Sequence, residues 1–362
     1  MENLIEIGVD GANVMVGKYN SFSTHVKAMT NRDLVVIKCV CHSLHLAAEH
    51  SFKSLPKHLD FLIKESHNWF SCSSKLGLNV DTMTERVNAI NKILDQWDVL
   101  KLHFQLTKDR ERCYTSQQLF EMLDDKKNYL YKVFLKKKLR ELTALNTAFQ
   151  SDQANSLKLM EGLLHLLRNY LSILIPPMHL EKVLDKDIFS FNFKDYVMSA
   201  TIINFGYSFH EAQVGIERND VSCVQERCRH FLIELCYQIQ SRLPFNIEVL
   251  EKINLLTPEN ATSQVRRPDI TTLTTSFKSL INEDVDATVS EWNRVEWEHP
   301  ETAESFWVEV SENKNTLDEN WFERISKLAL ALLSLPFSNA ATRINIQLSL
   351  LEWRTDQERC PY

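Results

Sequence analysis

A single aspartate near the N-terminus is the residue best placed in this sequence to do chemistry. Asp10 directly follows the apolar run 4–9, and Gly8, Gly11 and Gly17 flank it, three of the seven glycines in the chain. Glycine allows a close backbone approach or a positive φ, which a site at the end of a strand requires. A carboxylate there could bind a divalent cation, whereas a turn or cap is the commoner role of an aspartate that stands alone.

A second candidate group follows another β-branched run, 34–39. Cys39 ends this run, and His42 and His45 stand three residues apart in the following helical segment. Thiolate and imidazole are zinc ligands, but the sequence offers no complementary Cys or His pair with metal-ligand spacing. We therefore expect packing and hydrogen bonding from these three side chains, with metal ligation as the alternative.

The residue spacing predicts which elements must position these groups. A βαβα arrangement is expected over 1–75, with strands 4–9 and 34–39 and helices 21–29, 42–50 and 56–70. Apolar stripes of helical period dominate 76–290, including one long stripe over 116–149. The composition of 257–275 is typical of a loop or a disordered segment. A Trp-rich acidic segment opens 291–362. We expect these three regions to be the domains.

The composition indicates a globular protein without a membrane span. The 44% hydrophobic and 25% charged residues are ordinary values, and no apolar stretch approaches the roughly 18 residues that a spanning helix needs. The net charge of -7 argues against a generally basic nucleic-acid binder. The N-terminus lacks the features of a signal peptide. We expect an intracellular protein, nuclear or cytoplasmic and not secreted, with Cys223, Cys228 and Cys236 as buried thiols.

A basic run within the helical region could contact DNA. Lys136, Lys137, Lys138 and Arg140 could follow phosphates along a helix. Acidic residues interrupt the surrounding sequence, so a solvated helix face is the alternative. No zinc-finger motif or other obvious DNA-reading module accompanies the run.

The C-terminal region combines tryptophans with an unusually apolar helix. The tryptophans of this region stand at positions 292, 297, 307 and 321. Such tryptophans serve more often as core or interface anchors than as platforms for stacked bases. The segment 328–335 is apolar on most sides, and a helix of this kind is normally buried, in its own chain or against a partner.

The chain resembles the hAT-family transposases, which have an RNase H-like core. The family pattern D-G-A-x-x-M-x-G followed by C-x-x-H is matched from Asp10 to Gly17 and again from Cys39 to His42. The family's C-terminal pattern, a Trp followed by L-x-x-L-A-x-x-L-L-x-x-P-x-S-N-A, is similar to residues 321–340. Residues 89–100 resemble the stretch that opens the family's helical insertion domain. The resemblance implies a partial RNase H-like α/β core with a large helical insertion, in a predominantly helical chain that 291–362 completes.

The resemblance also implies how such a core would cut DNA. Three carboxylates hold magnesium or manganese in the family, and two ions stabilise the attacking and leaving oxygens. Asp10 matches the second carboxylate, and the first would lie upstream of the nine residues that precede it. Arg343 matches the family's Arg, and Thr342 or a one-residue gap stands where the third carboxylate, a glutamate, is expected. With one carboxylate of three, we expect an ancestral metal site that is incomplete, no cofactor and no enzyme activity.

These observations predict an interaction protein rather than an enzyme. We expect a catalytically inactive hAT-derived protein that forms a homodimer, or pairs with a related hAT-derived protein, through Trp321, Leu328, Leu332, Leu333 and Leu335. Residual DNA association is a secondary expectation, and no small-molecule substrate is expected. The alternative is a fragment of a metal-dependent DNA transposase whose first strands and first catalytic Asp are missing from this chain. A decaying gene product without a cellular role is the third outcome.

Overall fold

The computed structural model is predominantly helical and divides into two compact units. It describes residues 6–9, 15, 17, 19–30, 35–71, 92–93, 95–111, 113–150, 156–281, 284–296, 302–314 and 320–335. Unit 1 contains Met1–Ser43, Ala148–Glu161 and Leu243–Tyr362, and unit 2 contains Leu44–Thr147 and Gly162–Arg242. The first and last parts of the chain therefore share one unit, although about 200 residues separate them in the sequence.

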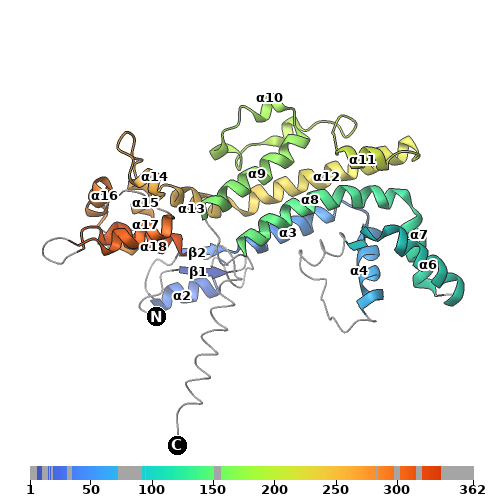
Figure 1. Ribbon diagram of the computed structural model, residues 1–362, viewed down its shortest axis with the longest axis horizontal. Coiled ribbons are helices and arrows are strands. Elements are labelled where there is room, and N and C mark those ends of the chain that lie inside the picture. The colour runs from blue at the N-terminus through green and yellow to red at the C-terminus, as the bar shows by residue number, and fades with distance from the viewer. Residues whose placement is uncertain are drawn as a thin grey trace, which may run out of the picture. The chain divides into compact units, whose positions relative to one another are not determined.

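The N-terminal part of unit 1 is a βαβ element. Its members are β1 (Glu6–Val9), α2 (Phe22–Thr30) and β2 (Val35–Lys38). Helix α3 (Val40–Phe52) follows, and unit 2 begins within it at Leu44. The two strands pair in parallel, from Glu6 opposite Val35 to Val9 opposite Lys38. Parallel neighbours need a crossover, and α2 supplies it beside the strand pair (Figure 1). The predicted strands 4–9 and 34–39 and helix 21–29 are confirmed within two residues.

The remainder of unit 1 is built from short helices. They are α13 (Pro244–Asn254), α14 (Pro258–Ala261), α15 (Thr271–Ser276), the 3-10 helix η3 (Lys278–Ile281), α16 (Val285–Arg294), α17 (Ala303–Glu312) and α18 (Glu323–Leu333). Helix α18 packs against α13, α16, α17 and η3. The expectation of a loop over 257–275 is wrong in part, because Thr257 caps α14 by accepting the N–H of Asn260 with its hydroxyl.

The described residues of unit 2 form helices and their connections and include no strand. Its elements are α4 (Lys57–Ser71), α6 (Trp97–Glu111), α7 (Tyr114–Asp124), α8 (Lys126–Phe149), α9 (Ser156–Leu174), α10 (Pro177–Leu180), the 3-10 helices η1 (Asp185–Asp187) and η2 (Phe193–Tyr196), α11 (Tyr207–Ala212) and α12 (Arg218–Arg242). The long helices α8 and α12 run alongside each other (Figure 1), with the rings of Phe134 and Phe231 edge to face at 5.6 Å. No described helix of the chain is both long enough and apolar enough to cross a membrane.

The predicted stripe over 116–149 is two helices rather than one. Asp125 leaves the helical conformation, with ψ at 111°, and its carboxylate accepts the backbone N–H of Lys127 at the start of α8. An aspartate at this position satisfies an amide that the first turn leaves unpaired. The apolar period continues across the break, which is why spacing alone does not reveal it.

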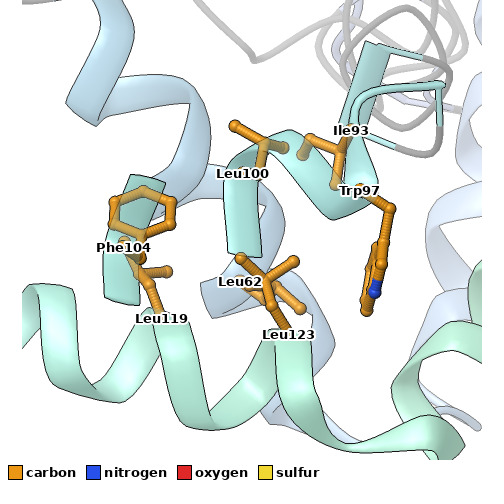
Figure 2. Packing of buried hydrophobic residues seen from close by; sticks show 7 residues of the cluster. All are labelled: Leu62, Ile93, Trp97, Leu100, Phe104, Leu119 and Leu123. Atoms are coloured by element: carbon orange, nitrogen blue, oxygen red, sulfur yellow. The ribbon is translucent and has the colours of Figure 1, made fainter. Parts of the chain in front are cut away.

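One apolar cluster holds α4, α6 and α7 together within unit 2. Figure 2 shows the side chains of these helices turned toward one another, with Phe104 beside Leu119 and Leu62 beside Leu123. All of the labelled side chains are buried. Each large apolar side chain removed from water contributes about 1.5–3 kcal/mol, so the cluster stabilises this end of unit 2.

Candidate functional site

The second candidate group begins where the two parallel strands end. The backbone N–H of Cys39 donates to the carbonyl of Val9 at 2.8 Å, which extends the ladder past β2. Asp10 follows Val9 in the sequence and itself lies outside the described residues. The carboxyl ends of neighbouring parallel strands are the usual place for a ligand in such sheets.

The Cys and His group is built into the start of α3. Cys39 is buried, in agreement with a packing role, while His42 and His45 are half-buried on the helix. The hydroxyl of Ser43 donates to the Cys39 carbonyl. Among the described residues, no three Cys, His, Asp or Glu side chains gather closely enough to hold a metal ion. The metal-ligand alternative therefore has no support from this part of the chain.

The three thiols of α12 divide between its faces. Cys228 and Cys236 are buried, as expected, and burial raises the pKa of both thiols. The expectation is wrong for Cys223, which is exposed. Cys228 lies five residues further along the helix, and five residues turn a helix well away from its starting face. Cys223 lines a shallow surface pocket of about 540 Å³ together with Glu226 and His230.

The residues expected to form a dimer differ in how far they are exposed. Leu328, Leu332 and Leu335 are buried within unit 1, where α18 packs on its neighbouring helices. Leu333 is half-buried. Trp321, just before α18, is 47% exposed and is the member of the group with most surface available to a partner.

The tryptophans of this region separate in the same way. Trp292 and Trp307 are fully buried and stack with their ring centroids 6.2 Å apart. The indole N–H of Trp292 donates to the carbonyl of Pro268 at 2.9 Å, and that of Trp307 donates to the carbonyl of Leu256 at 2.8 Å. The expectation of a core role is confirmed for these two, whereas Trp297 lies outside the described residues.

The basic run on α8 does not form one continuous surface. Lys136 donates to the carboxylate of Asp95 at 2.5 Å, and Lys138 is only 5% exposed. Lys137 and Arg140 are exposed. A protein gains affinity for DNA with each phosphate it neutralises, so the two remaining exposed charges give a smaller electrostatic footprint than the four in the sequence.

Lys137 and Lys138 instead line a cavity of about 430 Å³ within unit 2. Helix α9 contributes Asn169 and Ser172 to the wall, and the segment 198–206 contributes Asn204 and several apolar side chains. Glu141, one turn beyond Lys138 on α8, also faces the cavity. This arrangement is capable of binding a small polar molecule, and sequence reasoning did not find it.

One signal in the sequence could have shown that Lys138 departs from the solvated face. Phe134 precedes it by four residues and Leu142 follows it by four, and side chains at this spacing share a helix face. Both apolar residues are buried. The partners from 169–206, however, are brought to the cavity by tertiary structure and leave no local pattern.

The resemblance to a family rests on the sequence motifs described above. The sequence matches no protein-family model and has no significant match among curated proteins.

Proposed function

We propose that this protein is a catalytically inactive derivative of the hAT transposases that acts by protein–protein association through the α17–α18 part of unit 1. The exposed Trp321 beside the buried α18 carries the proposal. Tryptophan is enriched among the residues that dominate binding energy at interfaces.

The organisation of the chain supports the fold in this proposal. An RNase H-like core interrupted by a helical insertion requires the two ends of the chain to share one unit. Unit 1 contains both Met1–Ser43 and Leu243–Tyr362, and most of the intervening helices form unit 2. The parallel βαβ element with α2 as its crossover is a component that such a core requires.

The donor set does not fit a two-metal site. Thr342 stands where the resemblance implies a glutamate, and a neutral hydroxyl cannot supply the charge of a carboxylate ligand. Both Thr342 and Asp10 lie outside the described residues. We therefore derive no metal-dependent step for this protein.

Surface exposure supports association over a purely internal role for this region. Val308 on α17 is 44% exposed and Trp321 is 47% exposed, while Phe306, Trp307 and Val310 of α17 point into the core. A well-packed base with an exposed aromatic side chain is consistent with an interface, where aromatic residues are enriched. DNA association has weaker support, because the basic run is divided.

Light scattering of the purified chain across a concentration series tests this proposal. We expect a dimer whose dissociation constant rises at least tenfold in Trp321→Glu, equivalent to about 1.4 kcal/mol. Leu332 is unsuitable for this purpose because it is buried, and a charge there would unfold unit 1. Circular dichroism establishes that Trp321→Glu remains folded.

Val265→Glu is the matched control. Val265 is also an exposed apolar residue of unit 1, in the segment between α14 and α15, and its replacement should leave the dimer unchanged. A monomer at every concentration would overturn the proposal. Metal-dependent DNA cleavage that is lost in Asp10→Asn would instead support the alternative, a transposase.

A further inference from the structure

We propose that the cavity between α8, α9 and the segment 198–206 binds a small organic anion that has an apolar body and one N–H or O–H donor. The inference concerns unit 2 alone and does not depend on the association proposed for unit 1. Its cavity of about 430 Å³ lies within the size range of small-molecule sites.

Two lysines supply the anion selectivity. Lys137 and Lys138 are adjacent on α8 and both line the cavity. No described residue forms a hydrogen bond or an ion pair with either ammonium group. Burial lowers the pKa of Lys138, Glu141 opposes this effect, and the Lys137 ammonium lowers the pKa further. An anion placed between the two nitrogens would relieve their mutual repulsion and favour the charged form of Lys138.

Glu141 is the reason why the ligand should carry an N–H or O–H donor. Glu141 lines the cavity, and its Oε2 atom is shielded from solvent and has no hydrogen-bond partner among the described residues. Rotation of the carboxylate about its last side-chain bond would turn this oxygen toward the cavity. A buried carboxylate oxygen without a partner costs free energy that an N–H or O–H group of a ligand would recover. Because Glu141 is negative and the two lysines are positive, the ligand must present its anionic group and its donor at separate points.

The other residues that line the cavity favour a ligand with an apolar body. Ile173, Met198 and Phe205 line the cavity, and Ile202 at the same site is 69% exposed. Burying an apolar ligand surface against these side chains contributes about 25 cal/mol per Å². Asn169, Ser172 and Asn204 add polar groups that could orient the ligand.

The dye 8-anilinonaphthalene-1-sulfonate is a suitable probe, since it combines a sulfonate, an N–H donor and an aromatic body. We expect saturable binding to the native chain, followed by fluorescence. Lys137→Gln should weaken binding about tenfold. Ser172→Phe, at an exposed position on α9, should occlude the cavity and abolish specific binding. Arg140→Gln, also exposed on α8 but not part of the cavity, is the matched control and should bind as the native chain does.

A neutral analogue separates this site from general hydrophobic adsorption. N-phenyl-1-naphthylamine keeps the rings and the N–H group but lacks the sulfonate, so its affinity should be about tenfold lower. Circular dichroism of each variant excludes unfolding as the cause of lost binding. The proposal is overturned if the neutral dye binds equally well, if Lys137→Gln and Ser172→Phe bind like the native chain, or if no binding occurs up to about 1 mM dye.

Discussion

Glu291, on α16, accepts the backbone N–H of Arg324 in the first turn of α18 at 2.9 Å. The same carboxylate oxygen accepts the N–H of Ile325 at 2.9 Å, and its other oxygen accepts the Arg324 guanidinium at 3.1 Å. Glu291 is only 4% exposed. A carboxylate thus takes the place of a local cap, satisfies two unpaired amides and complements the positive end of the α18 dipole.

Replacing Glu291 should therefore destabilise unit 1. Glu291→Gln keeps the size of the side chain but removes the charge that strengthens all three hydrogen bonds. We expect a loss of about 1–3 kcal/mol in the free energy of unfolding of unit 1, measured by urea denaturation followed by the fluorescence of the buried tryptophans. Glu312→Gln, an exposed glutamate at the end of α17, is the control and should change stability little. Equal effects in the two variants would contradict this role.

The local elements of unit 1 could be predicted from the sequence, whereas their joining could not. Strands β1 and β2 follow from β-branched runs, and α2 follows from the apolar period between them. Nothing in the neighbourhood of Arg324 indicates that its cap comes from Glu291, 33 residues earlier. Tertiary packing determines which distant residues pair, and the local spacing of residues carries no information about it.

The candidate site residues, too, are visible in the sequence, whereas their burial and partners depend on the tertiary structure. The sequence shows four basic residues in the run 136–140 of α8, but the burial of Lys138 and the ion pair of Lys136 with Asp95 depend on neighbouring segments of the chain. The tryptophans were expected to be core or interface residues, and only the tertiary structure separates the buried Trp307 from the exposed Trp321. The family motifs at Asp10 and Thr342 lie outside the described residues, so the roles assigned to them remain predictions.

Trp307 offers a second test of the unit 1 core. Trp307→Phe removes the indole N–H that donates to the Leu256 carbonyl at 2.8 Å and leaves a space in a fully buried site. We expect a loss of roughly 2–4 kcal/mol, which combines the unpaired carbonyl with the cavity. Thermal or urea denaturation measures the change. Trp321→Phe is the matched control: its ring is half exposed, so the stability should stay within about 0.5 kcal/mol.

Lys132 presents the opposite case, a side chain whose removal should stabilise the protein. It is fully buried on α8 within unit 2, and burial lowers its pKa well below the ordinary value. Its Nζ atom lies 4.0 Å from the centroid of the Trp97 ring and has no hydrogen-bond partner in the described part of the chain. An ammonium group in this position bears the cost of desolvation without an anion to offset it.

The sign of the pH dependence follows from this shift. Between the lowered pKa in the folded state and about 10.4 in the unfolded state, the unfolded chain binds more protons at Lys132. The stability of unit 2 therefore rises with pH through that window, and below it the desolvation cost is fully present. Lys132→Met should remove this slope and raise the free energy of unfolding at pH 7 by roughly 1–4 kcal/mol, because an apolar side chain of similar length fills the same space.

Urea denaturation at several pH values between about 6 and 10 measures both the pH dependence of stability and the change in stability at pH 7. Lys126→Met, at an exposed position in the first turn of α8, is the matched control and should reproduce the pH dependence of the native chain. If Lys132→Met instead lowers stability and keeps the native slope, the contact of a charged Lys132 with the Trp97 ring outweighs its desolvation. Lys132 would then hold α8 to α6 as a cation rather than as a neutral amine.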